Sequence, residues 1–185
     1  MKIHILDRAK KKKFIAGLEN LGMKKIPELL IRSGKEKIRA YSGDLSTEQI
    51  MEIWRLLPIE GVGLYVGKDM VNRSGVREVR LSLDGMHLWK DQLTDRNFIL
   101  NVEQEELWFN GKDIELTEDQ IKAFESGFVC VKSSDSKDFV GVGKIGRSPA
   151  TSGIPPKEET EVPFSSGKTL FSFLPKERRR KSQTI

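Results

Sequence analysis

Apolar and polar positions recur along this chain with two different periods, and the first of them is helical. After a short apolar stretch at the N-terminus, Asp7 stands where a helix N-cap is expected. The helix that it begins carries Phe14, Leu18 and Leu21 at helical spacing, and Gly22 is expected to end it.

A hairpin and a second helix are predicted next. Residues 28–42 read as two strands joined by a turn at residues 33–35. Ser46 and Gln49 form a capping box, and Pro58 closes the helix that they begin. The apolar face of that helix consists of Ile50, Ile53, Trp54 and Leu57. This first part of the chain therefore predicts a small α/β unit.

From residue 59 onward, apolar and polar residues alternate, which is typical of strands. Val79, Leu81 and Leu83 are expected to point inward from one strand, and a short helix follows around residues 86–89. A later hairpin has an all-polar tip at residues 133–137. Short strands at regular spacing favour a small barrel over a sandwich.

These patterns predict an α+β fold with two domains. A small N-terminal α/β unit is expected over residues 1–95, and a pseudo-barrel of mostly antiparallel strands over residues 96–185. Residues 147–167 are rich in Pro, Ser and Gly. We expect them to form a flexible loop inside the second domain, because an apolar strand at residues 170–174 still follows them.

The chain after this loop turns from apolar to cationic. Phe171, Phe173 and their neighbours are expected to complete the barrel, and Pro175 to stop further strand pairing. A basic C-terminal tail would then emerge from the rim of the barrel. Among the tryptophans, Trp54 and Trp108 fit core positions, whereas Trp89 fits either core packing or a surface role.

The charge is distributed unevenly along the chain. Residues 1–42 hold 12 Lys/Arg against 4 Asp/Glu, residues 43–174 hold 15 against 22, and residues 175–185 hold 5 against 1. If folding brings the two basic ends to one side, the molecule has a cationic face suited to phosphates. The alternative is that these charges serve only solubility.

Few residues suggest catalysis or metal binding. Cys130 stands among apolar residues, as expected for a buried strand position, and His4 and His87 lack metal-site spacing. The sequence shows neither a membrane-spanning run nor a signal peptide, so we expect a cytoplasmic protein without membrane contact.

Three stretches imitate nucleotide-binding motifs by letter only. GVGKIG at residues 141–146 is not followed by a helix signal. SSGKT at residues 165–169 and YVGKD at residues 65–69 both lack the first glycine of a phosphate-binding loop. No carboxylate recurs with a His or Cys at mechanistic spacing. We therefore expect no enzyme activity, no cofactor, no catalytic residue and no metal ligand, although an unrecognised catalytic site remains a third hypothesis.

The chain resembles the PUA domain, a small RNA-binding barrel, over residues 97–181. The resemblance depends on the order of three segments, ILNVEQEELWFNGKDIEL, FVGVGKI and LFSFLPKERR. The segment upstream, LLIRSGKEKIRAYSGDLSTEQIMEIWRLLPIEGVGLYVGK, is similar to the one preceding the PUA domain in archaeal stand-alone proteins and in cytosine-5 RNA methyltransferases. Residues 147–167 depart from the resemblance, since they exceed the tight turn expected there.

The resemblance and the charges nominate two sets of RNA-binding residues. The resemblance implies an RNA-facing surface formed by Gly111, Lys112, Gly141, Gly143 and Lys144. The charge pattern adds the hairpin and tail residues Lys35, Arg39, Lys176, Arg178, Arg179 and Arg180. The structural alternative for each glycine is a turn or bulge, and for the tail it is a frayed, solvated terminus.

Two functional hypotheses follow. The first is an RNA-binding adaptor that recognises structured tRNA or rRNA in RNA modification or ribosome biogenesis. An RNA-modifying enzyme or a pre-ribosomal particle would be its further partner. The second is an accessory subunit that acts mainly through protein contact with an RNA-modifying enzyme.

Overall fold

The computed structural model describes residues 2–57, 59, 61–72, 74–147 and 167–180. The helices are α1 (Arg8–Ala16), α2 (Thr47–Leu56), α3 (Leu83–Leu88), α4 (Val102–Phe109) and α5 (Glu118–Ala123), with the 3₁₀ turns η1 (Glu19–Leu21), η2 (Lys90–Gln92) and η3 (Lys176–Arg178). The strands are β1 (Ile3–Ile5), β2 (Leu29–Ser33), β3 (Lys37–Tyr41), β4 (Leu64–Val71), β5 (Arg77–Leu81), β6 (Asn97–Ile99), β7 (Ile114–Glu115), β8 (Gly127–Lys132), β9 (Phe139–Arg147) and β10 (Lys168–Ser172). Most of the flexible loop predicted at residues 147–167 lies outside the described residues.

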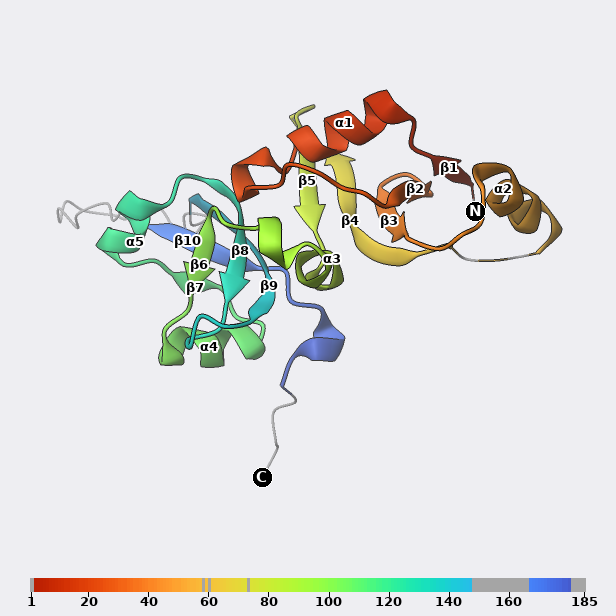
Figure 1. Ribbon diagram of the computed structural model, residues 1–185. Helices are drawn as coiled ribbons and strands as arrows, with labels where there is room; N and C mark the ends of the chain where they lie inside the picture. The colour runs from red at the N-terminus through yellow and green to blue at the C-terminus, as the bar shows by residue number, and fades with distance from the viewer. Residues whose placement is uncertain (1, 58, 60, 73, 148–166, 181–185) are drawn as a thin grey trace, which may run out of the picture.

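The strands form two mostly antiparallel sheets, as expected for an α+β fold (Figure 1). The first sheet has the order β1-β2-β3-β4-β5, and all its neighbouring strands are antiparallel. The second has the order β6-β8-β9-β10-β7 and includes one parallel pair, β6 with β8. Since residues from all five strands of the second sheet enter one core, this sheet curls into half a barrel.

Local capping explains where the first two helices begin. The Asp7 side chain accepts a hydrogen bond from the Lys10 backbone at 2.8 Å, which confirms the predicted N-cap. The capping box of Ser46 and Gln49 is confirmed by reciprocal hydrogen bonds. The first helix is shorter than predicted, because α1 ends at Ala16 and the turn η1 covers the stretch before Gly22.

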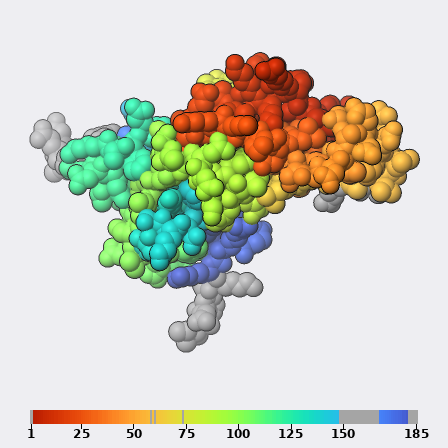
Figure 2. All heavy atoms as spheres, in the orientation of Figure 1, coloured from red at the N-terminus to blue at the C-terminus, as the bar shows by residue number. Residues whose placement is uncertain are grey.

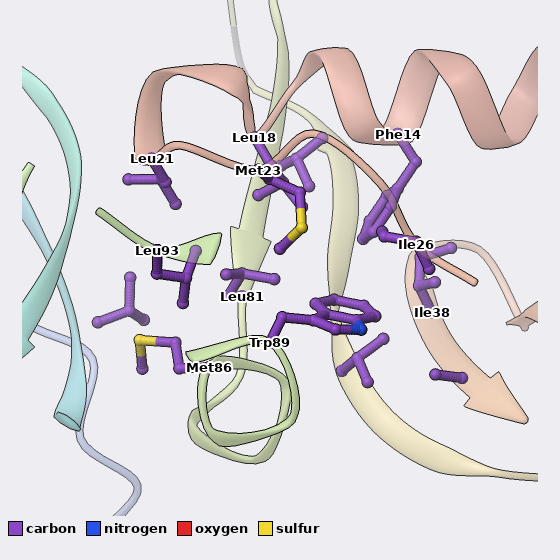
Figure 3. Packing of buried hydrophobic residues seen from close by; sticks show 14 of the residues in the cluster. Phe14, Leu18, Leu21, Met23, Ile26, Ile38, Leu81, Met86, Trp89 and Leu93 are labelled. Carbon is purple, nitrogen blue, oxygen red and sulfur yellow. The ribbon is translucent and has the colours of Figure 1, made fainter. Parts of the chain in front are cut away.

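The main hydrophobic core lies between α1, the first sheet and α3. Figure 3 shows Phe14 of α1 pointing toward Ile26 and Trp89, and Leu81 of β5 lying between Leu18 and Met86 of α3 in the same cluster. Trp89 also lies in this core, 3% exposed, which settles the role that the sequence left open. The alternation predicted for β5 is confirmed for Val79 and Leu81, both buried, while Leu83 instead begins α3.

The second sheet contributes to the same core. Cys130 of β8 and Phe139 and Val142 of β9 belong to the cluster that α1 and α3 cover. Burial raises the pKa of the Cys130 thiol to about 12, so this residue is structural, as predicted. The two sheets therefore share one hydrophobic core, which holds them against each other, unlike two domains joined only by a flexible linker.

A second core fills the curl of the C-terminal sheet. Trp108 of α4 is fully buried there, and its indole Nε1 donates a hydrogen bond to the Val140 carbonyl at 3.2 Å. Leu170 and Leu174 complete this core. The sequence assigned this role to Phe171, Phe173 and their neighbours. That expectation is wrong for Phe173, which follows the end of β10 and is 39% exposed.

The other face of the first sheet is covered only in part. α2 packs against the β1–β2 end, where Ile50 meets Ile3 and Ile31. The predicted apolar face of α2 is correct for Ile50 and for Trp54, which packs against this cluster, but Leu57 is 55% exposed. The part of this face that belongs to β3, β4 and β5 carries polar and charged side chains.

A buried carboxylate links three strands of the first sheet to one another and, through an arginine, to α1. Asp69 of β4 forms ion pairs with Arg32 of β2 and with Arg77 of β5, whose Nε lies 2.6 Å from Oδ1. Arg77 also donates to the Lys13 carbonyl near the end of α1 at 2.8 Å. Burial raises the pKa of Asp69, but hydrogen bonds and charges from Arg77 and Arg32 outweigh this effect and hold the pKa below its ordinary value.

Removing this carboxylate is expected to lower stability and to change its pH dependence. We expect Asp69→Asn to cost about 2 kcal/mol, less than for a fully buried pair because both arginines are partly exposed. The pKa is depressed, so the wild type has the full contribution above pH ~4, the ordinary Asp value, and loses it as the pH falls through the folded pKa. Urea unfolding at a series of acidic pH values measures this. If the free energy of unfolding fell equally with pH in the wild type and in Asp69→Asn, this stabilising role of Asp69 would be contradicted.

Candidate functional site

Three cationic residues lie side by side across the uncovered part of the first sheet. Lys37 of β3 is the direct partner of Lys68 on β4, and Lys68 is the direct partner of Arg80 on β5. Directly paired residues point to the same face of a sheet, so these three side chains form a cationic row. Arg39 and its partner Tyr65 lie on the same face, next to the row.

The cationic row is unfavourable unless something compensates its charges. Like charges directly opposite each other in a sheet destabilise the pair. Glu36 compensates one of them weakly, since its carboxylate lies 3.4 Å from Lys68 Nζ and is itself 45% exposed. Lys37 is exposed and has no ion pair among the described residues. A polyanion bound on this face would relieve the repulsion.

Aromatic side chains border the cationic row where the two sheets meet. The Arg80 guanidinium lies 4.5 Å from the ring centre of Phe173, and the edge of Phe128 contacts the Phe173 ring at a centroid distance of 5.8 Å. Burial raises the pKa of the Tyr65 phenol despite the charge of nearby Arg80, so the hydroxyl stays protonated at neutral pH. Exposed rings beside cations can stack bases while the cations bind phosphates.

A cleft of about 210 Å³ opens at this border. We call it the junction cleft, because β4, β5 and α3 of the first unit line one side and β9 with the segment after β10 line the other. Its lining includes the side chains of Tyr65, Arg80, Asp84, Phe173 and Arg178. Across its mouth, Arg178 Nη2 lies 3.3 Å from Asp84 Oδ1, and both side chains are nearly half exposed.

Four residues nominated from the sequence meet at the C-terminal end of α4. Gly111 adopts a φ of +69° in the turn, and the side chain of Arg179 lies where a Cβ at Gly111 would stand. Lys112 is exposed beside it. Arg180 donates its backbone N–H to the Phe109 carbonyl at 2.8 Å, and its guanidinium lies 5.5 Å from the Phe109 ring centre. These cations suit the negative end of the helix dipole, so they have a structural role too.

Gly141 and Gly143 are both buried as whole residues, but Gly141 lines the junction cleft and Gly143 does not. A Cβ at Gly141 would lie 2.7 Å from Trp108 Cζ2, and one at Gly143 would collide with the Leu170 side chain. Both positions require glycine because neighbouring side chains fill the space. The turn or bulge that the sequence offered as the structural alternative fits Gly141 alone, which lies beside an irregularity in the β8–β9 register.

The other nominated cations are dispersed. Lys144 of β9 forms an ion pair with Glu78 of β5 at 2.8 Å, and this hydrogen bond lowers the pKa of Glu78. Lys35 and Lys176 are exposed, far apart in the sequence. Arg39 donates from Nη1 to the Gly63 carbonyl at 2.9 Å, while its Nε is buried without a partner among the described residues.

The basic helix and the basic C-terminal segment do not share one side. α1 crosses the top of the molecule in Figure 1, and η3 lies at the bottom; the red and blue atoms of Figure 2 are separated in the same way. The predicted common cationic face is therefore wrong for Lys10 to Lys13. Of the sheet-face cations, Arg80 lines the junction cleft together with Arg178 of η3, while Lys37 and Lys68 lie outside its lining.

Sequence reasoning missed three members of this surface. Lys68 belongs to a stretch that resembles a phosphate-binding loop by letter only, so it was not predicted to bind RNA. No sequence signal indicated Tyr65 or Asp84. Arg80 was expected to point outward from its strand, which the sheet register confirms. The missing signal was the pairing between strands, because a single chain gives no direct information about which residues become cross-strand neighbours.

Within the described residues, no group of three or more His, Cys, Asp or Glu side chains is placed to hold a metal ion. None of the helices seen there is long and apolar enough to span a membrane.

The sequence was compared with protein-family models and with curated proteins. No family model matches the sequence. No curated protein matches it either. The resemblance to the PUA domain therefore stays a prediction from the quoted motifs.

Proposed function

We propose that the protein is a non-enzymatic adaptor that binds structured RNA, either tRNA or rRNA, on the face that carries the cationic row. The observation that carries this proposal is the direct pairing of Lys37 with Lys68 and of Lys68 with Arg80. Their mutual repulsion favours a polyanionic ligand, and the neighbouring aromatic rings suit exposed bases. In cytoplasmic RNA modification or ribosome assembly, such an adaptor would position RNA for a catalytic partner.

We also propose that the second sheet is a PUA-like pseudo-barrel and that the first sheet forms the unit that precedes it. The support is the order of elements, with strand β6, helix α4, a glycine turn at Gly111 and strand β7 following one another as in the quoted motif. The Arg178–Arg180 segment would then continue the RNA surface from the junction cleft to Lys112.

Ultraviolet crosslinking in the native cell tests this function. We expect covalently attached tRNA or rRNA, with crosslinked peptides from β3, β4 and β5 and from the segment around Phe173. Sequencing of the RNA identifies its class, and mass spectrometry identifies the peptides. Recovery of no RNA, or crosslinks confined to α1, would contradict the proposal.

A second candidate function is protein contact with an RNA-modifying enzyme. The observation in its favour is a group of exposed leucines on and near α2, namely Leu45, Leu56, Leu57 and Leu64, whose exposed fractions run from 40% to 80%. Exposed apolar groups of this kind often mark interaction surfaces. Co-purification of a stoichiometric enzyme without RNA would favour this candidate over the first.

A further inference from the structure

We propose that the junction cleft binds one unpaired nucleotide of the RNA and prefers guanine. This inference depends on the proposed RNA-binding function and specifies which feature of the RNA is recognised. A duplex lying over the cationic row would place an extruded base at the cleft, because Arg80 belongs both to the row and to the cleft lining.

The size and walls of the cleft fit a single base. Its volume of about 210 Å³ is below the ~300 Å³ at which pockets for larger organic ligands begin. Phe173 presents a partly exposed ring at one wall, held in place by Arg80 on its face and by the edge of Phe128. Tyr65 lines the cleft as well. Aromatic rings and guanidinium planes are the groups on which unpaired bases stack in RNA-binding proteins.

The polar groups at the mouth determine which base is preferred. The carboxylate of Asp84 can only accept hydrogen bonds, and it has two oxygens. Guanine presents two adjacent donors, N1–H and N2–H, beside the O6 acceptor on its Watson–Crick edge, whereas none of the other three bases presents two adjacent donors on that edge. A carboxylate therefore matches guanine best. Arg178, which pairs with Asp84 at 3.3 Å in the free protein, would transfer to a phosphate when the base binds.

Four hairpin RNAs that differ only in one bulged nucleotide test the inference. By fluorescence anisotropy, we expect the wild type to bind the bulged-G hairpin about tenfold more tightly than the bulged-A hairpin. In Asp84→Asn the ratio should fall to about one, because an amide offers one donor and one acceptor. The matched control is Asp138→Asn, an exposed carboxylate at the β8–β9 tip, which should keep the full ratio.

Phe173→Leu provides an independent check on stacking. This variant should weaken binding of all four bulged hairpins while leaving a hairpin without a bulge unchanged, and a thermal melt verifies that it is folded. Equal binding of the four RNAs by the wild type, or an unchanged guanine preference in Asp84→Asn, would overturn this inference and leave RNA binding intact. Failure to bind any of the hairpins would overturn the proposed function and this inference together.

Discussion

Trp108→Ala is expected to destabilise the protein by about 4 kcal/mol, in the range typical of deleting a fully buried aromatic side chain. Trp108 is fully buried inside the curled second sheet, where it contacts Gly141 and donates to the Val140 carbonyl. Alanine would leave a cavity and an unpaired carbonyl. The loss should exceed a quarter of the stability of a typical domain, which is ~5–15 kcal/mol.

Chemical denaturation with an unchanged m-value measures this loss. The matched control is Trp54→Ala, because Trp54 has the same side chain but is only half buried on α2, and its removal should cost clearly less. Trp108→Phe should retain most of the packing and show an intermediate effect. A loss below about 1 kcal/mol for Trp108→Ala would contradict the description of the second core.

Local features of the fold were predictable because short-range chemistry determines them. The N-cap at Asp7, the capping box at Ser46 and the burial of Trp108 all follow from neighbouring residues, and the structure confirms each. The end of α1 was misjudged, since the apolar spacing up to Leu21 continues through a 3₁₀ turn that serves the same core.

The candidate site was less predictable, because it depends on contacts between segments far apart in the chain. Lys37 and Lys68 become neighbours only through the β3–β4 register, which includes an irregularity after Ile38. Gly141 lines the junction cleft, but the sequence could not show that Trp108 fills the space where its side chain would stand. The charge count shows where basic residues cluster in the sequence. It does not show on which side of the folded molecule α1 places them.

The second large effect concerns RNA affinity. Replacing Lys37, Lys68 and Arg80 together with glutamine should weaken binding of a structured tRNA or rRNA fragment about 100-fold. This value assumes ~1 kcal/mol for each lost phosphate contact after screening by salt. Glutamine keeps part of the side-chain stem, although Arg80→Gln also removes the guanidinium that lies over the Phe173 ring. The matched control replaces Lys10, Lys12 and Lys13 of α1 with glutamine, which removes the same charge from the opposite side.

The salt dependence of RNA binding by these two triple variants tests the central claim most directly. If RNA lies on the cationic row, the slope of log affinity against log salt should become shallower by about 2 in the row variant, at roughly 0.7–0.9 for each phosphate contact. The α1 variant should keep the wild-type slope. An unchanged slope in the row variant, or an equal loss in the α1 variant, would contradict RNA binding at the cationic row.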